Sequence, residues 1–270
     1  MSMGHCPEQR SGFEVTKDWN GGDQVVIRSP KGASVRVSLQ GGQVVSWRND
    51  RGEELLFSSS KAVFKPPKAV RGGIPICFPQ FGNCGTLEQH GFARNKMWTV
   101  DEEAPPLSYG DNNNKASVDL LLKPSDDDLR CWPHSEVRIE GLETLDYLDN
   151  LIQRERFTEQ GDAITFESEM DRVYVGSPSV IAVLDHEKKR TFIIRKDGLP
   201  DIVVWNPWDK KSRSMADFGD DEYKQMLCVN AAAVERAITL KPGEEWTGKL
   251  ELSAVASTNC SDHLDYPGRL

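Results

Sequence analysis

The stretch from Gln24 to Trp47, QVVIRSPKGASVRVSLQGGQVVSW, predicts three short β-strands. Residues 24–28, 34–38 and 44–47 alternate apolar and polar side chains, which is the period of a strand with one buried face. Pro30-Lys31-Gly32 and Gly41-Gly42 separate the three segments, and proline and glycine are typical of tight turns. We therefore expect neighbouring strands that are joined by short turns.

The same pattern continues through the rest of the chain. Further strands are expected at residues 117–122, 163–167, 180–184, 191–195, 202–205 and 250–255, and one short helix at 220–226. Many short strands with turn residues between them predict an all-β antiparallel sandwich. We find no internal repeat and no domain boundary, so we expect a single domain over residues 21–256, with loose tails at 1–20 and 257–270.

The composition restricts the possible partners. With a net charge of −9 and a pI near 5.2, the chain lacks the basic surface that nucleic-acid binding requires. It has no apolar run of membrane-spanning length, and its first residues lack the apolar stretch of a signal peptide. The six cysteines are scattered without CxxC pairs or metal-ligand spacing. We therefore expect thiols in a reducing, cytoplasmic location, with no metal, no nucleic-acid partner and no membrane partner.

The segment from Arg71 to Arg94, RGGIPICFPQFGNCGTLEQHGFAR, contains the candidate binding residues. Its glycines and prolines impose sharp turns, and two arginines, a glutamine and a histidine lie among them. The guanidinium group is a planar fork of donors that matches phosphate or carboxylate oxygens two at a time. The segment thus indicates a site for a small, anionic, hydroxyl-rich ligand. The alternative is that these polar side chains lie near turns and are simply solvated.

RGGIPICFPQFG followed by QHGFAR resembles the signature of the glucose-6-phosphate 1-epimerases, hexose-6-phosphate mutarotases related to aldose 1-epimerase. The likeness continues in ERFTEQGDAITFESEMDRVY, VVWNPWDKK, MADFGDDEYKQMLCV and ITLKPGEEWTGKLELSAV. It covers most of the chain from Val25 to Val255 and is closest to the plant members. The resemblance implies the galactose-mutarotase-like β-supersandwich and interconversion of the α and β anomers of a hexose 6-phosphate. It implies no cofactor, because every step is a proton transfer, and we expect a monomer.

The reaction needs one group as base and one as acid, both within hydrogen-bond reach of the sugar. Family members use a glutamate as the base and a histidine as the acid, while arginines hold the phosphate. By resemblance, Arg71, Gln89 and Arg94 bind the substrate, and Asp171 in EMDRVY contacts sugar hydroxyls. Asp171 could instead begin a turn. His90 either contacts the sugar or is a turn residue before a glycine.

The family's catalytic glutamate lies in a strand of the form MLCVEAAAVE, whereas this chain has MLCVNAAAVE with Asn230 at that position. An amide has nearly the shape of a carboxylate but does not accept a proton near neutral pH. Residues five apart in an extended strand point to opposite faces, so Glu235 is not expected to replace the missing base.

The family's catalytic histidine lies in a strand of the HTYF type, and no HTYF occurs in this chain. Here CWPHS, ending at Ser135, runs directly into EVRIEGLET, beginning at Glu136, so a block of several strands is missing from the sandwich. Such a gap fits an in-frame deletion, through skipped exons or a faulty gene model. His90 remains as a weak candidate for the acid.

Two functional interpretations follow from these departures. The first is that the chain is a hexose-6-phosphate mutarotase with impaired turnover. The second is that it has no catalytic function, either as an inactive relative that at most binds phosphosugars or as an unproductive variant that folds poorly. Loss of central strands should leave unpaired strand edges and apolar surface, and the segment from Leu129 to Leu142 should be the least secure part of the fold.

Overall fold

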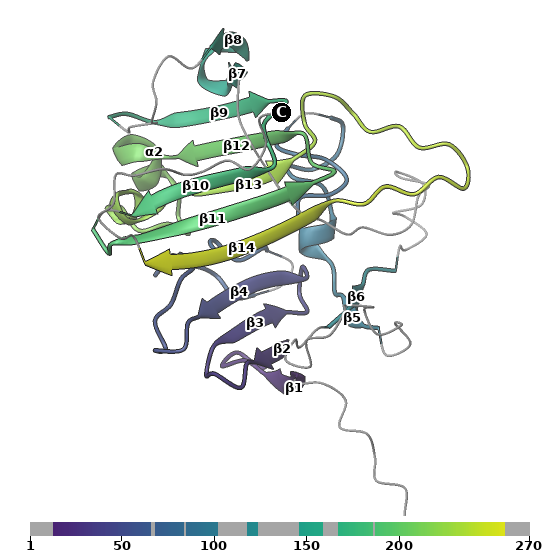
Figure 1. Cartoon of the computed structure of the whole chain (residues 1–270), viewed down its shortest axis with the longest axis vertical. Helices are drawn as coiled ribbons and strands as arrows, with labels where there is room; N and C mark the ends of the chain where they lie inside the picture. Colours follow the sequence, from purple (N-terminus) through teal and green to yellow (C-terminus); the bar gives the residue numbers. More distant parts are fainter. Residues whose placement is uncertain are drawn as a thin grey trace, which may run out of the picture. The chain divides into compact units, whose positions relative to one another are not determined.

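The computed structural model describes residues 13–65, 68–83, 85–101, 118–123, 146–158, 167–185 and 187–256. Within these ranges the chain forms four β-sheets and a few short helices, so the predicted all-β class is confirmed (Figure 1). The chain divides into two compact units. One contains Met1–Val137 and Asn206–Leu227, and the other contains Arg138–Trp205 and Cys228–Leu270.

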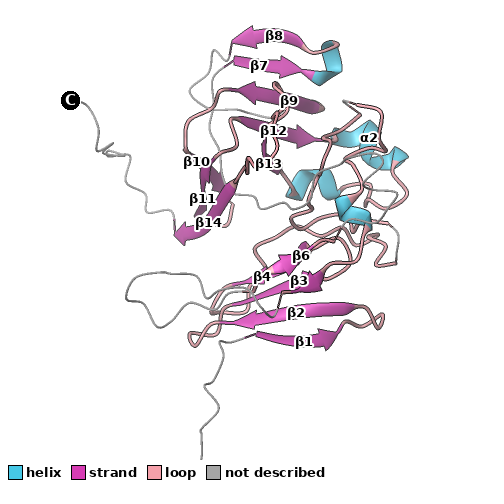
Figure 2. Ribbon diagram, turned by 90° about the vertical axis from the view of Figure 1, so that its right-hand side faces the viewer, coloured by secondary structure: helices cyan, strands magenta, loops and turns pink. Residues whose placement is uncertain are grey.

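The main sheet of the first unit consists of β1 (Phe13–Lys17), β2 (Asp23–Arg28), β3 (Ser34–Ser38) and β4 (Gln43–Arg48). These strands lie in chain order and each pair is antiparallel (Figure 2), as the opening stretch of sequence predicts for β2 to β4. A bulge interrupts the β3–β4 register between Arg36 and Val37. β1 lies within the segment 1–20 that was expected to be a loose tail, but all five of its residues pair with β2.

One face of this sheet is apolar and packs against a small second sheet. Val25, Val37 and Leu39 form the buried centre of the cluster. Partly buried side chains of the same sheet pack around this centre: Ile27, Val35 and Val44. The others come from the second sheet, which consists of β5 (Thr99–Val100) and β6 (Leu120–Leu121), and from the residue two positions before β6: Val100, Leu120 and Val118. The alternation of side chains along β2 and β3 therefore places their other residues on the opposite face.

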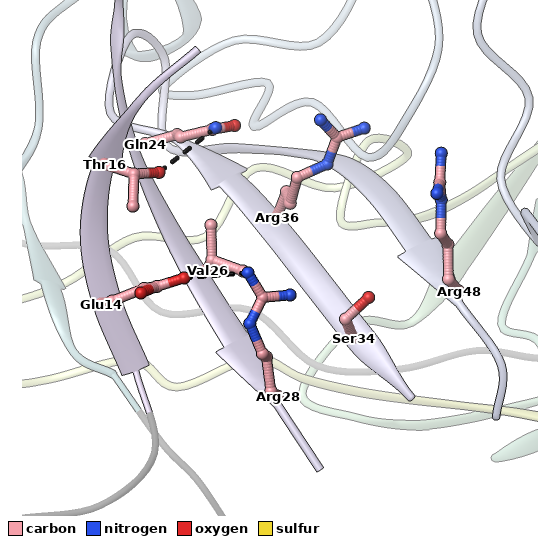
Figure 3. A pocket seen from close by; sticks show the side chains of 8 residues that line it. All are labelled: Glu14, Thr16, Gln24, Val26, Arg28, Ser34, Arg36 and Arg48. Carbon is pink, nitrogen blue, oxygen red and sulfur yellow. Dashed lines mark hydrogen bonds and ion pairs between the residues drawn. The ribbon is translucent and has the colours of Figure 1, made fainter. Parts of the chain in front are cut away.

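That opposite face carries a shallow pocket of about 250 Å³ with three arginines, Arg28, Arg36 and Arg48 (Figure 3). Arg28 Nη2 lies 2.8 Å from Glu14 Oε1, and Arg48 Nε lies 3.5 Å from Glu54 Oε2. The Arg36 side chain has no hydrogen-bond or ion-pair partner among the described residues. Two of the three charges on this face are thus already balanced by carboxylates.

The second unit contains two sheets. The larger has the order β13-β12-β9-β7-β8, and the smaller has the order β10-β11-β14 (Figure 1). The bounds are β7 (Asp146–Asp149), β8 (Glu155–Thr158), β9 (Met170–Val175), β10 (Val180–Asp185), β11 (Arg190–Asp197), β12 (Asp201–Asn206), β13 (Cys228–Ala232) and β14 (Lys249–Ala256). The most buried apolar residues come from the adjacent strands β9 and β12: Val173, Tyr174, Ile202, Val203 and Val204.

Four strand predictions for this unit are confirmed. β10 and β11 form the expected antiparallel pair, with Val180 opposite Arg195, and β12 and β14 lie at the predicted positions. The predicted strand at 163–167 lies outside the described residues except for its last position, and of the strand predicted at 117–122 only Leu120–Leu121 is assigned.

The helices in the described part of the chain are few and short. The helix expected at 220–226 is the 3-10 turn η3 (Glu222–Gln225), and two further 3-10 turns are η1 (Ala93–Asn95) and η2 (Asn150–Ile152). The α-helix α2 (Trp208–Ser214) was not predicted, because the sequence WDKKSRS has no apolar periodicity. Its Asp209–Arg213 ion pair, at 2.7 Å and four residues apart, stabilises it locally.

The described part of the second unit has exposed residues at and beside the edges of its sheets. β8 pairs with β7 at the edge of its sheet, and all four β8 residues are exposed. Leu184 at the end of β10 is 56% exposed, and Leu151 and Ile152 beside β7 are 46% and 48% exposed. The junction segment from Leu129 to Leu142 and the C-terminal tail lie outside the described residues.

Candidate active site

The Arg-Gly-Gly turn fixes the backbone of Arg71 against two neighbouring segments. Gly73 has φ of 60°, and a Cβ atom added there would collide with the carbonyl oxygen of Val44. Its N–H donates to the carbonyl of Phe57 at 2.7 Å, and the Arg71 carbonyl accepts from Ser59 N–H at 3.0 Å. The second glycine is therefore required, because only glycine combines a left-handed φ with this close approach.

A buried glutamine holds the same turn from the other side. The Gln43 side chain at the start of β4 is 1% exposed. Its Nε2 donates to the carbonyls of Val70 and Gly72, at 2.9 and 2.6 Å, and its Oε1 accepts from Val70 N–H at 3.2 Å. The residues on both sides of Arg71 are thus fastened to the core sheet through one amide group.

The Arg71 guanidinium makes a two-point contact with Asp217. Nε donates to Oδ2 at 3.2 Å and Nη2 donates to Oδ1 at 3.3 Å, across 146 positions of sequence. Both side chains are about one-third exposed, at 36% and 33%. Asp217 was not among the predicted site residues. The only signal for it was its place in the MADFGDDEYKQ motif, to which no role was assigned.

Arg94 lies in η1, directly after the His90-Gly91 turn. Its Nη2 donates to the carbonyl of Gln89 at 2.8 Å, whereas its Nε is buried and has no hydrogen-bond partner. The pKa of the Arg94 guanidinium is lowered, mainly by burial. The charge of Arg71 also lowers this pKa, whereas Cys77 and Glu88 act to raise it. The two arginines are therefore close enough to repel each other, and one of them keeps a desolvated donor unsatisfied, which costs about 1–3 kcal/mol.

His90 is held in a turn conformation with φ of 67°. Its Nδ1 accepts from Gly82 N–H at 3.1 Å, its own N–H donates to the Gly82 carbonyl at 2.9 Å, and its ring meets Phe81 edge-on at 5.0 Å. Burial and then the charges of Arg94 and Arg71 lower the pKa of His90 to about 4. The imidazole is neutral near pH 7 with its hydrogen on Nε2, and these contacts favour the turn role over that of a proton donor.

The remaining predicted site residues have the following places. The Gln89 side chain is exposed in the first unit, and it is the backbone carbonyl of Gln89 that accepts the hydrogen bond from Arg94. Asp171 and Asn230 belong to the second unit. Asp171 Oδ1 accepts from Asn150 Nδ2 at 2.8 Å, and Asn230 lies opposite Val203 with its Nδ2 3.0 Å from Cys228 Sγ. Arg71, His90 and Arg94 are brought together in the first unit.

Glu235 is committed to contacts beyond the end of β13. Its carboxylate pairs with Arg156 Nη2 at 3.3 Å and with Arg236 Nε at 3.1 Å. Its backbone N–H donates to Oδ2 of the buried Asp201 at 2.8 Å. These contacts agree with the expectation that Glu235 does not replace the family's base.

No group of three or more metal-ligating side chains occurs in the part of the chain that the structure describes. The two cysteines in that part, Cys77 and Cys228, are thiols. No described helix is long and apolar enough to cross a membrane.

Comparison with known proteins identifies the class. The family model for aldose 1-epimerase matches residues 23–135 and 131–253, so the chain belongs to the aldose 1-epimerase family. A crystal structure of a provisionally named mutarotase from Salmonella typhimurium superimposes with a TM-score of 0.67 at 21% identity, covering 91% of this chain and 92% of that one. The galactose-mutarotase-like fold implied by the sequence motifs is thereby confirmed.

Relatives within the family bear a more specific name. A protein of Cenchrus ciliaris, provisionally named glucose-6-phosphate 1-epimerase, is 54% identical over 299 residues, covering 93% of this chain and 91% of the relative. A protein of the same provisional name from Salmonella typhimurium is 28% identical over 268 residues, covering 82% of this chain and 87% of the relative. The resemblance to glucose-6-phosphate 1-epimerases is thereby confirmed.

The comparisons also locate a break in the family pattern. The two segments matched by the family model meet at residues 131–135, which is where CWPHS joins EVRIEGLET. The alignment with the Cenchrus protein spans 299 positions, but 93% of 270 residues is only about 251, which leaves about 48 positions without a counterpart in this chain. The first finding agrees with a break at the predicted junction, and the second agrees with a missing block of sequence.

Proposed function

We propose that this protein binds hexose 6-phosphates as a glucose-6-phosphate 1-epimerase relative whose anomer interconversion is impaired. The observation that carries the binding half is the pair Arg71 and Arg94, two mutually repelling guanidinium groups with a buried, unsatisfied Nε–H on Arg94. Asp217 already balances the charge of Arg71, so a phosphate dianion supplies the further negative charge and the missing acceptor for Arg94. Family membership and the names of the relatives support a phosphorylated sugar as the ligand.

Ring opening requires removal of the proton from the anomeric hydroxyl and protonation of the ring oxygen, and ring closure reverses both steps. Asn230 offers an amide where the reaction needs a base. His90 offers a neutral imidazole whose Nδ1 already accepts from Gly82 N–H, and whose pKa of about 4 leaves almost no imidazolium at neutral pH. Neither group is suited to the proton transfer, so we propose binding without efficient turnover.

Two measurements on the full chain test this proposal. Titration calorimetry should detect glucose 6-phosphate and a much weaker interaction with glucose. Exchange NMR of glucose 6-phosphate should show no anomer interconversion above the protein-free rate in the same buffer. Efficient exchange would overturn the impairment, and absence of any preference for the phosphorylated sugar would overturn the binding proposal.

Asn230→Glu provides the matched repair. It restores the base but not the histidine of the missing block, and each acid or base group contributes roughly 10²–10⁴-fold to such a reaction. We expect the exchange rate to recover little with Asn230→Glu alone, and to recover substantially only when the block with its histidine is restored as well.

A further inference from the structure

We infer that Asp217 is a positioning residue for phosphate recognition, which rests on the proposed function. It holds one edge of the Arg71 guanidinium so that the other edge is presented to the ligand. A guanidinium carries five N–H donors in one plane. Asp217 takes one from Nε and one from Nη2, leaving two on Nη1 and one on Nη2. The remaining donors form the end-on fork that matches two phosphate oxygens.

The carboxylate can orient Arg71 only if it is itself fixed, and its neighbours in sequence fix it. Phe218 is fully buried, and its ring centre lies 5.6 Å from that of Phe57. Phe57 also accepts the hydrogen bond from Gly73 that shapes the arginine turn. Both partners of the Arg71–Asp217 pair are therefore attached to the same short segment.

A second set of contacts attaches the turn after Asp217 to that segment. Glu222 Oε1 accepts from Ser60 N–H at 2.7 Å and Oε2 accepts from Gly219 N–H at 2.8 Å. Partial burial acts to raise the pKa of Glu222, but hydrogen bonds from Ser59, Ser60 and Gly219 outweigh it and lower the pKa to about 2. The carboxylate of Glu222 is thus ionised at neutral pH, and it links the turn after Asp217 to the segment that carries Ser60.

A positioning role and a simple charge effect predict opposite signs. Asp217 is negative and lies beside a cation that is proposed to bind an anion, so by charge alone its removal should strengthen phosphate binding. If Asp217 orients Arg71, removal of its carboxylate should weaken phosphate binding. The Arg71 side chain would then be free to rotate before the ligand binds and would lose that rotamer freedom on binding. The sign of the change in affinity therefore separates the two.

The experiment compares Asp217→Asn and Asp217→Glu with the unchanged chain, using glucose 6-phosphate, inorganic phosphate and glucose as probes in titration calorimetry. Asparagine keeps the shape but offers one acceptor, and glutamate keeps the charge but moves it by one methylene group. We expect both variants to bind glucose 6-phosphate and inorganic phosphate about tenfold more weakly, and to bind glucose with unchanged affinity.

Asp220→Asn is the matched control. Asp220 lies in the same loop and pairs with Lys61 Nζ at 2.6 Å, without contacting Arg71. It should leave all three affinities unchanged. In an Arg71→Ala background, Asp217→Asn should no longer weaken phosphate binding, which a general loosening of the fold would not predict.

The outcomes are distinct. If the unchanged chain binds glucose 6-phosphate and Asp217→Asn binds it equally or more tightly, the positioning role is wrong and the proposed function stands. If Asp217→Asn remains weakened in the Arg71→Ala background, Asp217 acts on something other than Arg71. If the unchanged chain binds neither phosphate probe, the proposed function fails and the positioning role fails with it.

Discussion

Two groups of arginines in the first unit differ in how the chain holds them. Arg28, Arg36 and Arg48 project from regular strands onto one face of a sheet (Figure 3), whereas Arg71 directly precedes a Gly-Gly turn and Arg94 comes after the His90-Gly91 turn. Arg28 and Arg48 are 64% and 51% exposed and pair with Glu14 and Glu54. Ion pairs of this kind contribute about 0–1 kcal/mol to stability.

Arg71 also pairs with a carboxylate, that of Asp217, but the two turn arginines differ from the sheet-face arginines in other respects. Arg94 has a buried donor with no acceptor, and Arg71 is aligned by a two-point contact rather than by strand geometry. The difference teaches that the number of arginines in a pocket is a poor guide to anion binding. A better guide is whether the backbone beneath them is fixed and whether their donors are left unsatisfied, since both lower the free-energy cost of binding.

The largest expected effect is on the backbone beneath Arg71. Gly73→Ala should destabilise the fold by about 3 kcal/mol, because the added Cβ combines an unfavourable φ with a collision against the Val44 carbonyl. Gly52→Ala is the control, since Gly52 also has a positive φ, of 78°, but has nothing within 4 Å of the added atom. It should cost only about 1 kcal/mol. Urea unfolding measures both, and equal losses would contradict the steric argument.

The next largest expected effect is on ligand affinity, which should distinguish the turn arginines from the arginines of the sheet face. Arg94→Ala should weaken glucose 6-phosphate binding by about 10–100-fold, the loss of one or two charge-assisted hydrogen bonds, while glucose binding changes little. Arg36→Ala, which removes the unpaired arginine of the sheet face, should change either affinity less than twofold. Titration calorimetry with both sugars decides this. If Arg36→Ala is the more damaging variant, the sheet face is the binding site.

Acid stability should distinguish the loop that supports the turn. The folded pKa of Glu222 is about 2, below its ordinary value of 4.5. Its stabilising contribution is therefore complete above pH 4.5 and is lost as the pH falls from 4.5 toward 2. Glu222→Gln should lose about 1–2 kcal/mol at pH 6 and show a smaller further loss between pH 5 and pH 3 than the unchanged chain.

Urea midpoints at several pH values test this acid effect. Glu245→Gln, at an exposed position, serves as the control and should follow the unchanged chain. A pH profile of Glu222→Gln that parallels the unchanged chain would show that Glu222 is not the titrating anchor.

The smallest effect concerns the sheet face. Glu14→Gln breaks the Arg28–Glu14 pair between side chains that are 64% and 54% exposed. We expect a loss of no more than about 0.5 kcal/mol, and less at high salt, because exposed pairs are screened. Thermal unfolding at low and high ionic strength checks this. A loss above 1 kcal/mol would place the sheet-face pairs in the same class as the turn contacts.

Local patterns predicted the sheets better than the site. β2, β3 and β4 follow from alternation and intervening turn residues, which act over a few positions. α2 was missed because its sequence WDKKSRS has no apolar periodicity. Asp217 was missed because it meets Arg71 across 146 positions, and no local pattern encodes such a contact. The departures expected at Asn230 and at the 131–135 junction could be proposed from the sequence because the surrounding motifs are intact.

Gln43 links the folding of the sheet to recognition of the ligand. It is the first residue of β4, and its amide grips the residues on both sides of Arg71. A slip of β4 by one residue would turn this side chain to the opposite face, because side chains alternate along a strand. Such a slip would release the arginine turn and would also carry Val44 out of the apolar cluster of the sheet. Misregistered molecules of this chain would therefore lose core packing and phosphate recognition together, and ligand affinity would report the fidelity of strand pairing.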